Sequence, residues 1–124
     1  MKNWKETYKS KVTTSPKAVN DVRSGQRVFI GSGAAESQLL VHALSERGQE
    51  LSDTQITHIL TLGTAPYTDP KLENGFRHNA LFIGPNVREA VAEGRADFTP
   101  VFLFEVPDLF RRGKLPIDVA FIQV

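Results

Sequence analysis

Three short apolar segments of this chain each end in a glycine-containing turn, and this repeated pattern constrains the fold more than any other feature. The segments are typical of β-strands, because they are short and contain many β-branched and aromatic residues. The turns that follow them are Gly31-Ser32-Gly33, Gly63-Thr64-Ala65-Pro66 and Gly84-Pro85-Asn86. Amphipathic segments typical of helices follow the first and third turns. Strands and helices therefore alternate along the chain.

This alternation predicts an α/β fold. Strands are expected at residues 27–30, 56–62, 79–83, 99–103 and 118–124, and helices at 15–24, 34–47, 87–93 and 106–112. Strands that alternate with helices form parallel sheets covered on both sides. We therefore expect an open, mainly parallel sheet with helices on both faces. The irregular segment 63–75 is longer than an ordinary connection, so a functional loop is predicted there.

The two ends of the chain carry further signals. Trp4 and Tyr8 lie one helical turn apart in a charged segment, so we expect a helix whose aromatic side folds back onto the body. At the other end, residues 119–124 form an apolar strand with no polar turn after it. Parallel strands are normally buried between neighbours, so we expect residues 1–124 to be one domain of a longer protein.

Composition excludes several classes of protein. The 124 residues include 15 Lys and Arg against 14 Asp and Glu, a net charge of +1 that favours neither nucleic acid nor acidic membranes as partners. The absence of cysteine excludes a disulfide scaffold, a zinc ribbon and a thiol nucleophile. Neither an apolar run of membrane-spanning length nor a secretory signal is visible, so a cytoplasmic location is expected.

The three glycine turns indicate a ligand site. In an open parallel sheet they lie along the carboxyl edge of the strands, where ligands bind and where glycine lets backbone approach a ligand closely. Glu36 occupies the last glycine position of a dinucleotide fingerprint, and Ser32 lacks the flanking glycines of a nucleophile elbow. The histidines, at positions 42, 58 and 78, lack metal-ligand spacing, so structural roles and no metal site are expected.

Several ordered motifs carry a family resemblance. They are residues 28–36 (VFIGSGAAE), 61–67 (TLGTAPY), 76–91 (FRHNALFIGPNVREAV), 94–103 and 115–124. Together they resemble the acetyl-CoA hydrolase/transferase family, which includes acetate, succinate and 4-hydroxybutyrate CoA-transferases, and the resemblance covers residues 4–124. Two positions depart from the family pattern, since proline is usual at Ser37 and common at Thr64.

The resemblance implies a thioester exchange. In this family a glutamate attacks an acyl-CoA to give an anhydride, which CoA converts into a glutamyl-CoA thioester, and an acceptor carboxylate reverses the sequence. The glutamate belongs to the second of two related α/β halves, and this chain resembles the first. No catalytic residue is therefore assigned here, and Glu36 and Glu105 are not taken as the nucleophile.

The resemblance also implies where the substrate lies. The residues expected to face the cleft for substrate and CoA are Gly31, Ser32, Gly33, Ala34, Glu36, Pro66, Gly84, Pro85 and Asn86. The expected partners are an acyl-CoA, a small carboxylate, the C-terminal half and further copies of the enzyme in a homo-oligomer. Coenzyme A is expected as a substrate, and no permanently bound cofactor is implied.

Two other functions remain open at the level of sequence. A non-catalytic nucleotide- or CoA-binding α/β module would use the same turns, and saturable binding of ATP or NAD without a response to CoA esters would favour it. A structural domain that pairs through its last strand is a weaker alternative, which the solution mass would reveal.

Overall fold

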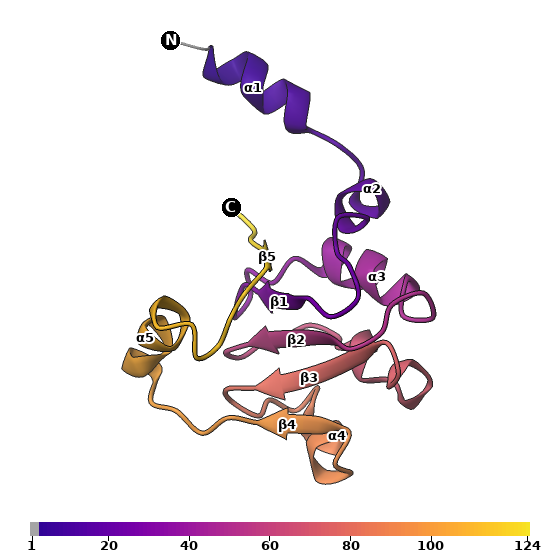
Figure 1. Cartoon of the computed structure of the whole chain (residues 1–124), viewed down its shortest axis with the longest axis vertical. Helices are drawn as coiled ribbons and strands as arrows, with labels where there is room; N and C mark the ends of the chain where they lie inside the picture. Colours follow the sequence, from indigo (N-terminus) through magenta and orange to yellow (C-terminus); the bar gives the residue numbers. More distant parts are fainter. Residues whose placement is uncertain (1–2) are drawn as a thin grey trace.

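A computed structural model describes residues 3–124, and its centre is an open parallel sheet (Figure 1). The strands are β1 (Arg27–Ile30), β2 (Thr54–His58), β3 (Phe76–Ala80), β4 (Ala96–Phe98) and β5 (Val119–Phe121). Their order across the five-stranded sheet is β4-β3-β2-β1-β5, and every neighbouring pair is parallel. The chain therefore moves outward from β1 to β4 and then crosses back to place β5 beside β1.

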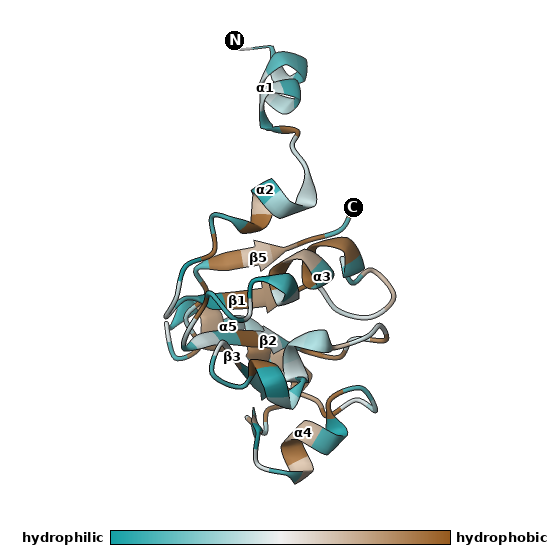
Figure 2. Ribbon diagram, turned by 90° about the vertical axis from the view of Figure 1, so that its right-hand side faces the viewer, coloured by the Kyte–Doolittle hydropathy of each residue, from teal (hydrophilic) through white to brown (hydrophobic). Residues whose placement is uncertain are grey.

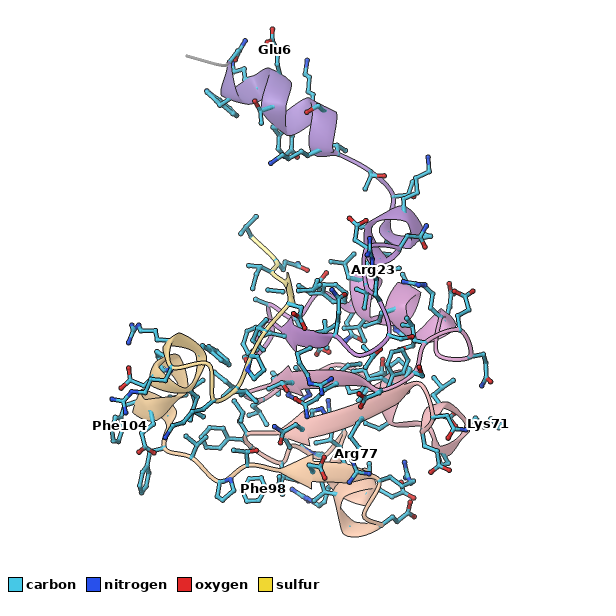
Figure 3. All side chains as sticks on the ribbon, viewed as in Figure 1. Glu6, Arg23, Lys71, Arg77, Phe98 and Phe104 are labelled. Carbon is cyan, nitrogen blue, oxygen red and sulfur yellow. The ribbon has the colours of Figure 1, made fainter. Side chains whose placement is uncertain are left out.

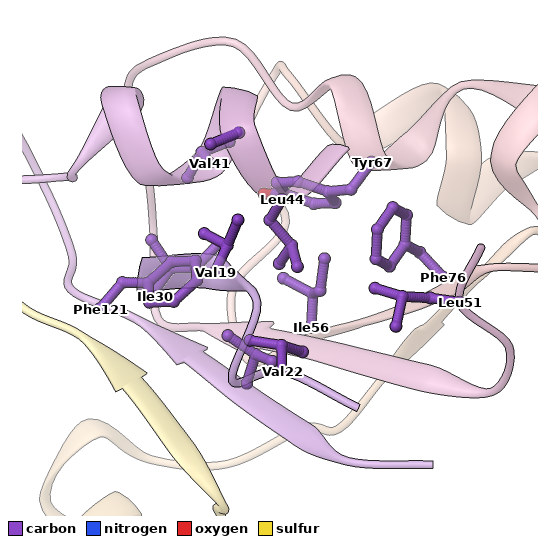
Figure 4. Close-up of a cluster of buried hydrophobic side chains, with 12 residues drawn as sticks. Val19, Val22, Ile30, Val41, Leu44, Leu51, Ile56, Tyr67, Phe76 and Phe121 are labelled. Carbon is purple, nitrogen blue, oxygen red and sulfur yellow. The ribbon is translucent and has the colours of Figure 1, made fainter. Parts of the chain in front are cut away.

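One face of the sheet carries the main hydrophobic core. It packs against α2 (Ser15–Val19), α3 (Gln38–Glu46) and the 3-10 turn η1 (Pro66–Thr68). The core side chains include Val19, Val22, Val28, Ile30, Val41, Leu44, Leu51, Ile56, Tyr67, Phe76 and Phe121 (Figure 4). A second 3-10 turn, η2 (Pro70–Leu72), and the helix α4 (Arg88–Ala92) complete the connections from β2 to β4.

The opposite face is covered by α5 (Val106–Arg111), which follows the 3-10 turn η3 (Leu103–Glu105). Successive residues of a strand point to opposite faces, so Phe29 lies on this side while its neighbours Val28 and Ile30 are in the main core. The Phe29 and Phe110 rings meet edge to face, with their centroids 5.5 Å apart. A smaller cluster around Leu81 completes the contact. The prediction of a parallel sheet with helices on both faces is confirmed.

The expectation that the N-terminal segment folds back onto the body is wrong. The helix α1 (Trp4–Lys11) has no buried residue and projects away from the sheet (Figures 1 and 2). Trp4 is 71% exposed and Tyr8 is 65% exposed. Val12 and Thr14 have extended backbone, which carries the helix away from α2. Among residues 3–124, no helix has the length and apolar character needed to cross a bilayer.

Several predicted boundaries are displaced, although the strand at 27–30 is placed as expected. The strands expected at 56–62 and 79–83 begin earlier, at Thr54 and Phe76. The cause is that the first residues of these strands include polar ones such as Thr54 and His78, which are buried here, while the apolar residues after the strands belong to loops. The strand expected at 99–103 is wrong, because β4 ends at Phe98, before the expected segment begins. The last strand is also shorter than expected and ends at Phe121.

The helices are likewise shorter than predicted. The helix expected at 34–47 begins only at Gln38, because Gly33 adopts a left-handed φ of 70° and its amide bonds to the Leu60 carbonyl. The helix expected at 15–24 ends at Val19, although Val22 is buried as predicted. The helices expected at 87–93 and 106–112 each end one residue early, at Ala92 and Arg111.

Candidate functional site

The structure places the three glycine turns side by side at the carboxyl edge of the sheet. Gly33 forms a parallel bridge with Thr61, and its amide donates to the Leu60 carbonyl at 2.6 Å. The Asn86 side-chain amide donates to Thr61 Oγ1 at 2.9 Å. The turn after β2 is therefore bonded to the turn after β1 on one side and to the turn after β3 on the other.

Gly63 is the residue at which these turns meet. Its amide donates to Glu36 Oε2 at 2.9 Å, and its carbonyl accepts from Asn86 Nδ2 at 2.9 Å. A Cβ atom at this position would lie 2.3 Å from Gln38 Nε2 and 2.7 Å from Glu36 Oε2, so any other residue would force these two side chains to move. Both backbone polar groups of one residue are thus held by side chains from the two neighbouring turns.

The sequence around Thr64 links this edge to the start of α3. Gln38 Oε1 accepts a hydrogen bond from the Thr64 amide at 3.1 Å and another from its hydroxyl at 2.9 Å. The hydroxyl also lies 3.3 Å from His42 Nε2. A proline at position 64 has no amide to donate. Thr64 therefore makes hydrogen bonds at this position that a proline would lack.

Beneath the turns lies a buried group of ring side chains. His58 Nε2 is 2.8 Å from the Tyr67 hydroxyl, and the His58 and His78 rings stack with centroids 4.4 Å apart. Thr61 Oγ1 approaches the same His58 nitrogen at 3.4 Å. His78 Nδ1 donates to the Ile56 carbonyl at 2.9 Å, which places its proton on that nitrogen. These contacts connect the glycine turns to the hydrophobic core beneath them.

Burial keeps this group uncharged. It lowers the pKa of His58 to about 3, with a further contribution from His78, and lowers the pKa of His78 to about 4. Burial and the Glu36 carboxylate raise the pKa of Tyr67. Groups with these pKa values are not poised for proton transfer near neutral pH. The geometry therefore agrees with the structural role expected for His58 and His78, while His42 is exposed on α3.

The predicted cleft residues differ in their access to solvent. Ala34 and Pro85 are exposed, and Ser32 is half-buried, with its hydroxyl accepting from the Ile59 amide at 3.3 Å. The Gly31 amide donates to the Phe121 carbonyl at 2.9 Å, at the point where β1 and β5 diverge. Glu36 and Gly84 are buried, so in this chain they stabilise the turns from inside the domain and are not open to solvent.

Two hollows flank these turns. The first, of about 490 Å³, lies between the 64–70 loop and α4, and the predicted residues Pro66 and Asn86 line it together with Arg95. The second, of about 350 Å³, is apolar and is lined by Leu81, Phe82, Phe98, Pro100, Val101, Phe102 and Glu105. Among residues 3–124, no three acidic or histidine side chains gather closely enough to hold a metal ion.

Glu105 has a structural explanation. Its carboxylate accepts from the Phe102 amide at 3.0 Å and so fixes the turn that begins η3. The aromatic residues around it were missed by the sequence reasoning. The available signal was the close spacing of Phe98, Phe102 and Phe104 within and beside the strand expected at 99–103.

The fold and the three glycine turns define a class of protein, an open parallel α/β domain. Domains of this class bind ligands at the carboxyl edge of the sheet, where these turns lie. The family model for the acetyl-CoA hydrolase/transferase N-terminal domain matches residues 1–124. The chain therefore belongs to the acetyl-CoA hydrolase/transferase family and corresponds to its N-terminal domain.

Similar proteins agree with this assignment. The chain is 43% identical over 121 residues to a 4-hydroxybutyrate coenzyme A transferase of Clostridium kluyveri, covering 98% of this chain and 28% of the relative. It is 45% identical over 105 residues to a succinyl-CoA:acetate/propanoyl-CoA:succinate CoA transferase of Fasciola hepatica, covering 83% and 22%. The chain thus spans about a quarter of the length of these relatives.

Solved structures resemble the fold. A 4-hydroxybutyrate CoA-transferase from Porphyromonas gingivalis superposes with a TM-score of 0.73 at 26% identity, covering 97% of this chain and 26% of that one. RipA from Yersinia pestis superposes with a TM-score of 0.77 at 22% identity, covering 94% and 29%, and this likeness concerns the fold alone.

Proposed function

We propose that this chain is the N-terminal domain of a longer CoA-transferase, and that its three carboxyl-edge turns form one wall of the cleft for the acyl-CoA. The observation that carries the proposal is the pair of hydrogen bonds that Glu36 and Asn86 make with Gly63, which we call the Gly63 clamp. This clamp fixes all three turns as one surface. Preorganised backbone at such an edge suits a reaction in which an oxyanion develops. The relatives named as CoA-transferases supply the reaction class.

The reaction proceeds through the carboxylate of a glutamate in the remaining part of the enzyme. This carboxylate attacks the acyl carbonyl and expels CoA thiolate, giving an acyl-glutamyl anhydride. The thiolate then attacks the glutamyl carbonyl and releases the acyl group as a carboxylate, leaving a glutamyl-CoA thioester. An acceptor carboxylate runs these two steps in reverse and leaves as the new acyl-CoA, with the glutamate regenerated.

The carboxylates of this domain have other tasks. Glu36 is buried and bonded to the Gly63 amide, and Glu105 is bonded to the Phe102 amide. In each of these side chains one carboxylate oxygen holds a backbone amide, so both have a structural task in the turns. The domain therefore contributes binding and orientation, and the nucleophile comes from the second half.

Activity measurements test this division of labour. The isolated 124-residue chain is expected to show no CoA transfer from acetyl-CoA to a carboxylate acceptor, whereas the longer enzyme transfers CoA. Robust transfer by the isolated chain would overturn the proposal. In calorimetry, saturable binding of ATP or NAD without binding of CoA esters would favour a nucleotide-binding module instead.

A further inference from the structure

The helix α1 carries an apolar face that the rest of the domain leaves open to solvent. Trp4 and Tyr8 are four residues apart, so they lie on the same side of the helix, and Val12 follows directly at its end. Their exposed fractions are 71%, 65% and 61%. We call these three side chains the α1 face. No residue of α1 is buried by the part of the chain that the structure describes.

This helix has well-defined ends although it is short. The Asn3 side chain accepts from the Lys5 amide at 3.2 Å, Glu6 lies in the first turn, and lysines lie in the last turn, where they favour the helix dipole. A helix of eight residues is nevertheless marginal in water unless it packs on another surface. Capped ends combined with an apolar face therefore indicate that α1 packs on a partner.

The α1 face is turned toward the end of the sheet at which β5 lies. Figure 3 shows Glu6 on the side of α1 that points away from the sheet. Trp4 and Tyr8 are two residues before and two residues after Glu6, and two steps along a helix lead to its opposite side. Figures 1 and 2 both place β5 and the end of the chain at the same end of the molecule as α1. The two aromatic rings are thus directed toward the region into which the chain leaves β5.

The strand β5 presents an open edge in this region. Within residues 3–124, β5 pairs with β1 on one side, and its other side forms the edge of the sheet. Apolar residues follow it, and Ile122 is 59% exposed while Val124 is fully exposed. Open edges of parallel sheets are normally covered by further chain. A segment that continues from Val124 therefore begins beside this edge, on the side toward which the α1 face is turned.

The charges around the α1 face limit what can cover it. The helix contains three lysines and one glutamate, and Lys5 Nζ lies 5.6 Å from the centroid of the Trp4 ring. A complementary surface is apolar in its centre, to cover the rings of Trp4 and Tyr8, and carries carboxylates at its rim, to face the lysines.

We propose that the α1 face packs on the segment of the longer enzyme that directly follows Val124, and that α1 holds this segment against the open edge of β5. The inference rests on the proposed function, according to which the chain continues beyond this domain. The matched region is 28% of the Clostridium kluyveri relative and corresponds to the N-terminal domain of the family, so a long stretch of chain is available. The contact lies at the edge strand, away from the glycine turns, and serves the assembly of the domain.

Photocrosslinking within the longer enzyme tests the proposal. The photoreactive residue p-benzoylphenylalanine is placed at position 8 instead of Tyr8, and the crosslinked peptide is located by mass spectrometry. A crosslink is expected between position 8 and residues that directly follow Val124 in the same chain. The matched control carries the same group instead of Ser10, which is exposed on the other side of α1, and is expected to lose this crosslink.

A mixture of unlabelled and isotope-labelled enzyme separates crosslinks within one chain from crosslinks between two chains. A crosslink between two chains would overturn the proposal, because the α1 face then packs on a second copy. A crosslink to residues 13–124, or none from position 8, would overturn it as well.

Hydroxyl-radical oxidation of the unmodified longer enzyme gives a second readout. Trp4 and Tyr8 are expected to be oxidised at least about fivefold more slowly than in the same enzyme unfolded in urea, because the segment covers them. Equal rates in the two states would contradict the proposal. CoA transfer is measured on the same preparation. The expected crosslink in a protein without CoA transfer would support the packing of α1 while contradicting the proposed function.

Discussion

At the scale of single residues, Gly63 shows how one position connects three loops. Its amide and its carbonyl are bonded to Glu36 and Asn86, which come from turns on either side of it. A backbone group that loses such a partner inside the protein leaves an unsatisfied donor or acceptor, which costs free energy. The two side chains therefore stabilise the arrangement on which the proposed cleft depends.

Replacing Asn86 by alanine tests this clamp. The variant removes the hydrogen bonds to Thr61 Oγ1 and to the Gly63 carbonyl, and we expect the free energy of unfolding to fall by about 1–3 kcal/mol. Urea denaturation measures the change. Asn74→Ala, which removes an exposed amide in a turn, is the control and is expected to shift the value by less than about 0.5 kcal/mol. Equal stability of both variants would contradict the clamp.

The buried histidines predict a dependence of stability on pH. The pKa values of His58 and His78 are lowered to about 3 and about 4, whereas in the unfolded chain they return to the ordinary value of about 6.5. Below pH 6.5 the unfolded chain therefore binds protons that the folded chain does not. The free energy of unfolding should fall as the pH is lowered from 6.5 to 5, by up to about 1.4 kcal/mol per pH unit for each histidine.

Urea denaturation at pH 7.5, 6 and 5 measures this slope. The control variant His42→Gln, which removes an exposed histidine, is expected to keep the same dependence of the free energy of unfolding on pH. His78→Gln is expected to make the free energy of unfolding less dependent on pH, because one of the two buried imidazole rings is gone. A free energy of unfolding that stays constant from pH 7.5 to pH 5 would show that the two rings are not buried in their neutral form.

At the scale of elements, α1 and α3 differ in how far their side chains pack against the rest of the domain. The eight-residue α1 has no buried residue, whereas α3 places Val41 and Leu44 in the main core, both at most 1% exposed. Short helices gain most of their stability from packing. The stability of the isolated domain should therefore depend on α3 and hardly at all on α1.

Alanine substitutions compare the two helices directly. Leu44→Ala is expected to lower the free energy of unfolding by about 2–5 kcal/mol, because it removes buried contacts and leaves a cavity. Trp4→Ala is expected to change it by less than about 0.5 kcal/mol, although it removes a larger side chain. Thermal unfolding of the isolated chain measures both. A large loss in Trp4→Ala would mean that α1 packs against the body in solution.

The elements also show what the sequence could and could not predict. Alternation of strands and glycine turns was sufficient for the parallel sheet and for the shared edge of the three turns. The start of β3 was displaced because His78 looks like a loop residue but is buried within the strand. The start of α3 was missed because a long-range bond, from the Gly33 amide to Leu60, decides it.

At the scale of the whole molecule, apolar side chains remain exposed at the carboxyl edge, among them Phe82, Phe98 and Phe102 around the 350 Å³ hollow. The sequence predicted where the turns lie but not that these aromatic side chains are exposed, since their exposure depends on how the chain folds around η3. A domain whose turns are held together by hydrogen bonds, and whose Glu36 and Glu105 carboxylates bind backbone amides, is suited to form one wall of a cleft that the rest of the longer enzyme completes.

Trapping of the reaction intermediate tests this central claim most directly. The longer enzyme is incubated with acetyl-CoA and then with hydroxylamine, which converts an enzyme-bound glutamyl thioester into a hydroxamate, and the labelled peptide is located by mass spectrometry. The account predicts a single labelled glutamate outside residues 1–124. A hydroxamate on Glu36, on Glu105 or on any other carboxylate of this domain would contradict it.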